Sequence, residues 1–354
     1  MRLQAKFLIG ALAIWTGCID KVDLSLPASE FPIIVDGMIT DAPKEDTLKI
    51  RVSRAFQVDG AYHPVQGVRN VDVVITDNAG TAYILNEDST SIGTYWTTSL
   101  QGTVGQTYTM SLTTEEGANF ESTPETMLAA GTVDSIYFEV VQRKNKAKDI
   151  DEEGFNVYIN GKAAPGSSLR MRWKFDGTYQ VNTNPDALVR YDPFTGEVIH
   201  LACATACLCC ICYVSEKEES PIMANNTFVG ASEMSRVFMK YIPFNNYTFN
   251  QKYHVEITQM EVSQVVCDFY RAVKGQAENA SSLFQPPFFE LKGNISATNS
   301  NDLIVGVFSA AAVSKRSIYI FRGDIGHSTI SEEIIGDCRA VAANSSTTVP
   351  PFWQ

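Results

Sequence analysis

The sequence predicts a mostly β protein, with an immunoglobulin-like β-sandwich followed by a larger β-sandwich domain with one packed helix. Three observations support this fold class. Apolar and polar residues alternate with a period of two over several segments, as in half-buried strands. Tyrosine and phenylalanine, which suit strands, are frequent, and helical periodicity is confined to one segment. The 354 residues, 45% of them hydrophobic, suffice for two globular domains.

The first 17 residues have the pattern of an export signal. Arg2 and Lys6 precede an apolar run over residues 7–15, which is shorter than the roughly 20 residues of a membrane-spanning helix. Gly17 and Cys18 follow, a pair that is typical of a bacterial lipoprotein signal, in which the cysteine is acylated. We therefore predict a signal peptide at 1–17, lipid on Cys18 and a tether at 18–31. The alternative is a plain secretory signal followed by a coincidental cysteine.

The first β-sandwich is expected over residues 32–126. A strand is predicted at 48–52, where apolar and charged residues alternate, and another at 71–75. Residues 77–80, with the sequence Asp-Asn-Ala-Gly, predict a hairpin turn into a strand at 83–85. Short strands with regular turn signals are typical of an immunoglobulin-like sandwich.

The second domain is expected over residues 132–354, after a connector at 127–131. One helix is predicted near 262–277, because Val262, Val266, Phe269, Tyr270 and Val273 fall at helical spacing and form one apolar stripe. We expect this stripe to pack on a sheet of the second domain. Strands are predicted at 133–138, 169–175, 237–242, 253–259, 303–308 and 317–321, and the last two should close the domain.

Charge and motifs argue against several functions. The net charge of −12, without a basic and aromatic cluster, argues against nucleic-acid binding and favours a cationic or neutral ligand over an anionic one. The four histidines lack metal-ligand spacing, and the sequence has no G-x-S-x-G elbow, P-loop or Rossmann fingerprint. We therefore predict a protein that is not an enzyme and has no cofactor.

Five of the eight cysteines form a cluster. Overlapping C-x-x-C pairs would suit zinc, an iron–sulfur cluster or redox exchange. However, a closed metal site normally needs two separated ligand pairs. Apart from Cys18, the cysteines outside the cluster are the single Cys267 and Cys338, and His200 is the only histidine near the cluster in the sequence. We therefore predict no metal site, but a hairpin stabilised by one or two disulfides in an oxidising compartment. The clustered residues are Cys203, Cys207, Cys209, Cys210 and Cys212.

Several short motifs occur in a fixed order and spacing along the chain. They are Cys18-Ile19-Asp20, residues 34–40, Ser282-Leu283-Phe284, Gly293-Asn294-Ile295, residues 305–308 and Pro350-Pro351-Phe352-Trp353. In these motifs the chain resembles the Bacteroidota outer-membrane lipoprotein family of unknown function, domain of unknown function 4249. The resemblance implies that Cys212 and Cys338 are disulfide-bonded or close together, and that the partner is a TonB-dependent outer-membrane transporter.

Together these features predict a lipid-anchored outer-membrane protein at the cell surface. It is expected to be a non-catalytic accessory or ligand-capture partner of the transporter. The alternatives are a structural subunit of an outer-membrane assembly or secretion complex, and a surface hydrolase whose carboxylates are scattered over loops. The contact surface is expected on loops at 144–154 and 182–212, because the second loop combines Tyr191, Phe194 and His200 with polar residues.

Overall fold

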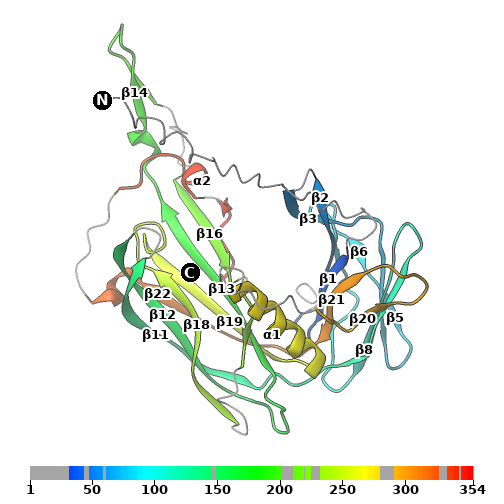
Figure 1. Ribbon diagram of the computed structural model, residues 1–354. Helices are drawn as coiled ribbons and strands as arrows, with labels where there is room; N and C mark the ends of the chain where they lie inside the picture. The colour runs from blue at the N-terminus through cyan, green and yellow to red at the C-terminus, as the bar shows by residue number, and fades with distance from the viewer. Residues whose placement is uncertain are drawn as a thin grey trace, which may run out of the picture.

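The fold consists of two β-sandwiches that lie side by side, with a helix between them (Figure 1). This mostly β architecture with a packed helix was predicted and is confirmed. Cys18, the signal peptide and the tether lie outside the described residues. The computed structural model describes residues 32–43, 48–58, 61–145, 149–200, 210–218, 220–224, 232–279, 291–326, 333–342 and 344–353.

The first sandwich contains two sheets of six strands each. The order in one sheet is β21-β1-β2-β7-β6 with β3 on β2, and in the other β20-β9-β8-β4-β5 with β10 on β8. The strands of the first sheet are β1 (Ile33–Ile39), β2 (Leu48–Val58), β3 (Ala61–Gly67), β6 (Asn86–Glu87), β7 (Thr94–Trp96) and β21 (Ile304–Ala310). Those of the second are β4 (Asp72–Asp77), β5 (Ala82–Ile84), β8 (Thr107–Thr113), β9 (Asn119–Ser122), β10 (Glu125–Thr126) and β20 (Ile295–Ala297).

The predicted hairpin turn joins β4 to β5. Asp77 Oδ1 accepts hydrogen bonds from the backbone N–H groups of Ala79 at 2.9 Å and Thr81 at 2.8 Å. These bonds, that of Thr81 above all, lower the pKa of Asp77 because they favour the carboxylate. Gly80 has φ +84°, which a side chain would strain. Val73 and Ile75 on β4 are fully buried, so the predicted alternation is confirmed.

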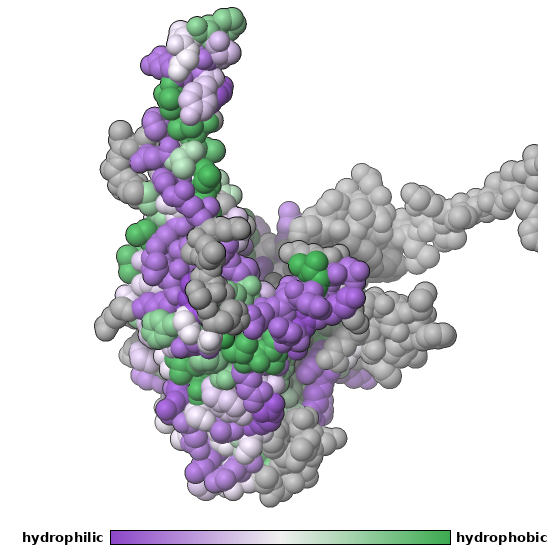
Figure 2. All heavy atoms as spheres, turned by 90° about the vertical axis from the view of Figure 1, so that its left-hand side faces the viewer, coloured by the Kyte–Doolittle hydropathy of each residue, from purple (hydrophilic) through white to green (hydrophobic). Residues whose placement is uncertain are grey.

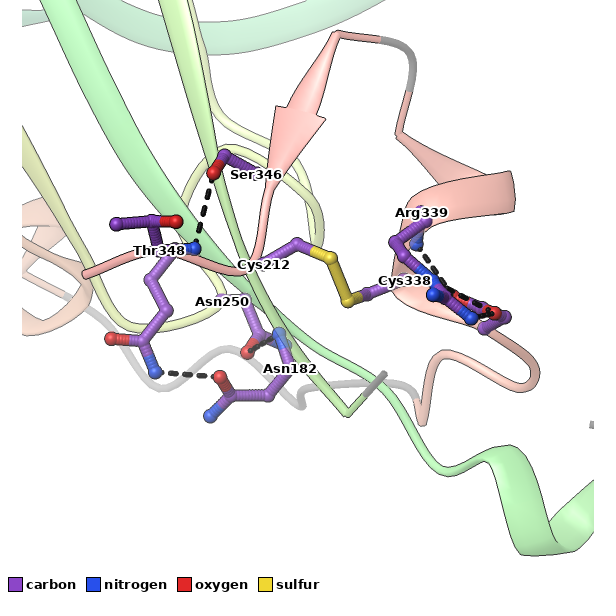
Figure 3. The surroundings of a disulfide bond; sticks show 9 residues. Asn182, Cys212, Asn250, Cys338, Arg339, Ser346 and Thr348 are labelled. Carbon is purple, nitrogen blue, oxygen red and sulfur yellow. Dashed lines mark hydrogen bonds and ion pairs between the residues drawn. A yellow bond between two sulfur atoms is a disulfide. The ribbon is translucent and has the colours of Figure 1, made fainter. Parts of the chain in front are cut away.

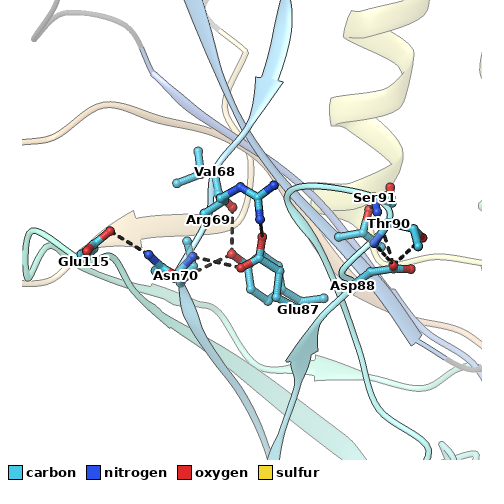
Figure 4. A network of polar contacts seen from close by, with 11 residues as sticks. Val68, Arg69, Asn70, Glu87, Asp88, Thr90, Ser91 and Glu115 are labelled. Carbon is cyan, nitrogen blue, oxygen red and sulfur yellow. Dashed lines mark hydrogen bonds and ion pairs between the residues drawn. The ribbon is translucent and has the colours of Figure 1, made fainter.

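Val68, Arg69 and Asn70 lie at the crossing from β3 to β4, where the chain changes sheets (Figure 4). Buried Tyr95 holds this crossing. Its hydroxyl donates to the carbonyl of Val68 at 2.8 Å and accepts from the N–H of Val71 at 3.1 Å. Between them, the N–H of Asn70 donates to Glu87 Oε2 at 3.2 Å. At this crossing the carbonyl of Val68 and the N–H groups of Asn70 and Val71 are therefore satisfied by side chains.

The second sandwich packs a three-stranded sheet, β11-β12-β18, on a six-stranded one, β22-β19-β13-β16-β23 with β17 on β13. The three-stranded sheet contains β11 (Thr132–Asn145), β12 (Ile150–Lys162) and β18 (Glu233–Pro243). The other contains β13 (Met171–Asn182), β16 (Ile211–Lys217), β17 (Ile222–Met223), β19 (Lys252–Glu261), β22 (Ser314–Phe321) and β23 (Ser345–Ser346). The remaining elements are hairpin β14 (Val189–Tyr191) and β15 (Val198–His200), helices α1 (Gln264–Asn279) and α2 (Cys338–Val341), and 3-10 turns at Pro185–Ala187 and Arg322–Ile325.

A buried glutamine fixes the connector to the second sandwich. Gln259 has no exposed surface, and its Oε1 accepts from the indole N–H of Trp173 at 3.0 Å. Its Nε2 donates to the carbonyl of Ala130 at 2.8 Å and to that of Lys162 at 3.0 Å. Because its polar atoms are paired, Gln259 can be buried without an unsatisfied group.

The predicted domain division needs a correction. Strand β21 pairs in parallel with β1, and β20 pairs with β9, so the chain returns to the first sandwich at residues 295–310. The expectation that the strand at 303–308 closes the second domain is therefore wrong, whereas the strand at 317–321 does join it as β22. Both faces of β21 are covered: Phe308 lies in the sandwich core and Val307 lies under α1.

Helix α1 fills the junction between the sandwiches (Figure 1). The predicted helix is present, and Val266, Cys267 and Tyr270 on its apolar face are buried. The stripe packs against Met260 at the end of β19 and also against Val307 of the first sandwich, so it contacts both units rather than the second sheet alone. Among the described helices, none is long and apolar enough to cross a membrane.

Candidate docking hairpin

Hairpin β14–β15 projects away from the second sandwich (Figures 1 and 2). Val189 pairs with His200 and Tyr191 with Val198. The segment at 182–212 was expected to be a loop, but the described part includes this antiparallel hairpin. Its three-residue strands are too short to show a clear period of two, which explains the difference.

The tip of the hairpin is a closely hydrogen-bonded turn. Asp192 Oδ1 accepts from the N–H groups of Phe194 at 2.8 Å and Thr195 at 2.9 Å. The backbone adds bonds of 2.9 Å from Gly196 N to Asp192 O and from Asp192 N to Glu197 O. The bonds from Thr195 and Phe194 lower the pKa of the Asp192 carboxyl. The turn therefore holds the backbone of residues 192–197 in one conformation.

The hairpin exposes a concentration of apolar side chains. Phe194 is 95% exposed at the tip, and Tyr191 is 66% exposed. In Figure 2 hydrophobic residues lie at the end of the projection and along it, between hydrophilic ones. Aromatic side chains surrounded by polar groups are typical of the centres of protein–protein interfaces.

The base of the hairpin is tied to the segment before α2. The N–H of Asn184 donates to the carbonyl of Ile334 at 2.7 Å, and its side-chain amide donates to Glu333 at 2.7 Å. The N–H of Gly336 returns a bond to the Asn184 carbonyl at 3.1 Å. His200 Nδ1 lies 3.2 Å from the carbonyl of Asp186 in the 3-10 turn, so this histidine contributes to the hairpin base.

A disulfide braces the same segment (Figure 3). Cys212 on β16 and Cys338 at the start of α2, the pair implied by the family resemblance, are bonded, with their Cα atoms 5.7 Å apart. Both are fully buried, and the N–H of Arg339 donates to Asp337, the N-cap of α2, at 2.9 Å. Cys210 is also disulfide-bonded, while Cys267 is a buried free thiol whose pKa is raised by burial. The remaining clustered cysteines, Cys203, Cys207 and Cys209, lie outside the described residues.

The other expected contact region is the turn between β11 and β12. Lys144 Nζ pairs with Asp149 at 2.8 Å, and the side chains of Val140 and Ile150 are 41% and 52% exposed. Residues 146–148 lie outside the described part. No aromatic side chain is exposed on the described part of this turn, so it has no counterpart of the exposed Phe194 on β14–β15.

One buried carboxyl group lies at the junction. Glu125 Oε1 accepts from Ser263 Oγ at 3.0 Å, just before α1, and from Asn294 Nδ2 at 2.9 Å. Burial raises the pKa of Glu125, and its Oε2 has no partner among the described residues. Asn294 Nδ2 also donates to the carbonyl of Phe308 at 2.7 Å, and Asn294 Oδ1 accepts from the N–H of Phe308 at 2.9 Å. Glu125 thus links β10, α1 and the β20–β21 segment, and sequence patterns gave no signal for it.

The sequence profile of the family described as domain of unknown function (DUF4249) matches residues 19–317. The chain belongs to this family. A comparison with curated proteins finds no match. The matched span of this DUF4249 protein includes the first sandwich, most of the second, hairpin β14–β15 and helix α1. The end of β22, strand β23 and Cys338 lie beyond it.

The structure of this DUF4249 chain brings the expected contact residues Tyr191, Phe194 and His200 onto one hairpin. Sequence reasoning missed the residues that hold the hairpin, namely Asp192 and Asn184. The sequence Asp192-Pro-Phe-Thr-Gly196 does carry the signals of a turn, with Asp and Pro first and Gly in the left-handed region at φ +71°. Groups of His, Cys, Asp and Glu suited to a metal ion are absent from the part of the chain that the structure describes.

Proposed function

We propose that this protein is an outer-membrane lipoprotein that acts as a non-catalytic accessory or ligand-capture partner of a TonB-dependent transporter. Lipid on Cys18 would anchor it at the cell surface, and hairpin β14–β15 would contact the transporter. The observation that carries the proposal is Phe194, an almost fully exposed aromatic side chain on a hydrogen-bonded turn.

Two physical arguments support a role in docking. Phe194 buries almost nothing in this chain, so the hydrophobic contribution of its ring is available to a partner. The turn beneath it is already ordered by Asp192 and braced at its base, which reduces the entropy lost on binding. A structural subunit of an assembly complex would use the hairpin in the same way, and the identity of the partner distinguishes the two functions.

The test is co-purification of affinity-tagged protein from outer membranes in mild detergent, with partners identified by mass spectrometry. The wild type should recover a TonB-dependent transporter, and Phe194→Ala should reduce recovery about tenfold, as expected for an interface anchor worth at least about 1.4 kcal/mol. Tyr247→Ala, which removes an aromatic side chain 43% exposed elsewhere on the second sandwich, is the matched control. Equal recovery with Phe194→Ala and wild type would show that the hairpin is not the contact.

The anchor has its own test. Cys18→Ala should abolish incorporation of labelled palmitate and release the protein from membranes, because two or more acyl chains are needed for stable anchoring. A variant that stays membrane-bound in high salt would contradict lipidation as the means of attachment.

A further inference from the structure

Two cationic side chains lie on the face of β13 that is turned away from the sandwich core. Trp173 and Phe175 point into the core of the second sandwich. Because side chains alternate along a strand, Arg172 and Lys174 point the other way. On that side Arg172 meets Tyr270 of α1, which in turn contacts Asp36 of β1. The two cations therefore lie where the two sandwiches meet.

Arg172 has an aromatic neighbour but no counter-ion. Its Cζ atom is 3.8 Å from the centroid of the Tyr270 ring. Its Nε is buried and has no hydrogen-bond partner within the described ranges. Asp36 Oδ1 accepts from the Tyr270 hydroxyl at 2.8 Å and makes no ion pair with Arg172. An arginine N–H that is buried without an acceptor is uncommon in native proteins.

Lys174 also lacks a counter-ion. It is partly buried and makes no ion pair with a carboxylate of the described chain, although Asp36 and Asp176 attract its charge at longer range. Burial, followed by the positive charge of Arg172, lowers the pKa of Lys174 to about 8. The charged and titratable groups facing it from the packed elements are Arg172 and Asp176 of β13, Lys217 of β16, Glu256 of β19, Asp36 of β1 and Tyr270 of α1.

Buried charges in proteins are normally paired, and two adjacent unpaired cations repel each other. A planar guanidinium beside an ammonium group is a common arrangement for binding the oxygens of a carboxylate or phosphate. We propose that Arg172 and Lys174 bind a small oxyanion, carried by a ligand that lies along the outward face of β13. This reverses locally the preference for a cationic or neutral ligand that the net charge of −12 suggests.

The same face of β13 provides room for the rest of such a ligand. Asp176 and Thr178, the next outward residues after Lys174, line a cavity of about 220 Å³. His254 and Phe352 form another part of its lining, with their rings stacked at 4.2 Å between centroids. The carboxylates of Asp176, Glu216 and Glu256 also line this cavity, together with Lys217, and Arg172 and Lys174 do not. The part of the ligand that occupies the cavity would therefore be neutral or cationic, with its oxyanion at Arg172 and Lys174. The site does not include hairpin β14–β15, so it does not depend on the proposed docking.

The test is calorimetric titration of the purified mature protein with sodium sulfate and, separately, with sodium acetate, at constant ionic strength. Both probes keep their charge between pH 6 and 10, so any pH dependence belongs to the protein. Saturable binding of either probe is expected at pH 7; sulfate alone indicates a tetrahedral group and acetate alone a carboxylate. Absence of saturable binding of both probes to folded protein would overturn the proposal.

Variants connect the binding to the two residues. Arg172→Met and Lys174→Met, which keep the length of the side chain, should each weaken binding at least tenfold at pH 7. Lys144→Met, on an exposed lysine of β11, should bind as the wild type does. Melting curves establish that each variant is folded, and unchanged affinity in the two folded Met variants would contradict the assignment.

The pH profile supplies a readout that a merely structural role would not change. Lys174 loses its proton as the pH rises through about 8, so wild-type affinity should fall between pH 7 and 10. Lys174→Arg should remove this fall, because a guanidinium stays charged throughout the range. A flat wild-type profile, or an equal fall in Lys174→Arg, would exclude Lys174 as the titrating group.

Discussion

Replacing both Cys212 and Cys338 by alanine should destabilise the second sandwich by about 4 kcal/mol. The bond closes a loop with a sequence separation of 126 residues, for which the chain-entropy relation gives about 5 kcal/mol, and measured losses of native disulfides are typically about 2–5 kcal/mol. Alanine is preferable to serine because both positions are fully buried, and a serine hydroxyl there would have no hydrogen-bond partner.

The assay is thermal and denaturant unfolding of the double variant under non-reducing conditions. For a unit of this size, about 4 kcal/mol corresponds to a fall of roughly 10 °C in Tm. Cys267→Ala is the control, since it removes a buried free thiol without removing a cross-link and should cost about 1 kcal/mol. A double variant that melts no lower than Cys267→Ala would refute the view that this disulfide, rather than the packing of α2, holds the segment in place.

Two further predictions concern the junction. Glu125→Gln should gain stability relative to the wild type as pH rises from 4.5 to 8. The pKa of Glu125 is higher in the folded than in the unfolded chain, so ionisation costs the wild type about 1.4 kcal/mol of unfolding free energy per unit of that difference. Parallel unfolding free energies of the two proteins across that range would contradict this. Gly293→Ala should lower the free energy of unfolding by at least about 2 kcal/mol, because a Cβ there would overlap the carbonyl oxygen of Gly306. Gly275→Ala, in open space on α1, should raise it by about 0.5–1 kcal/mol. Chemical denaturation compares the two variants, and equal effects would refute the close approach of Gly293 to Gly306.

Local patterns were sufficient for elements whose partners are neighbours in the chain. The turn at Asp77–Gly80 and the apolar face of α1 both follow from residues within one element, and the structure contains both. The alternating pattern of the strand at 71–75 likewise predicted which side chains are buried.

Long-range pairing could not be predicted in this way. The apolar run of β21 is compatible with either sandwich, and its parallel register with β1 depends on residues far apart in the sequence. The environment of Arg172 and Lys174 has the same origin: their alternation with Trp173 suggests a solvent-facing side, but α1 and β1 lie over part of it. The cysteine pair was accessible only through the family resemblance, because spacing alone leaves the connectivity open.

The most direct test of the docking proposal is photo-crosslinking in intact cells from residue 194. A photoreactive amino acid in place of Phe194 should crosslink to a TonB-dependent transporter, while the same group in place of Ile84, 69% exposed on β5 of the first sandwich, should not. Transporter crosslinks from position 84 and none from position 194, at equal protein levels, would contradict the account.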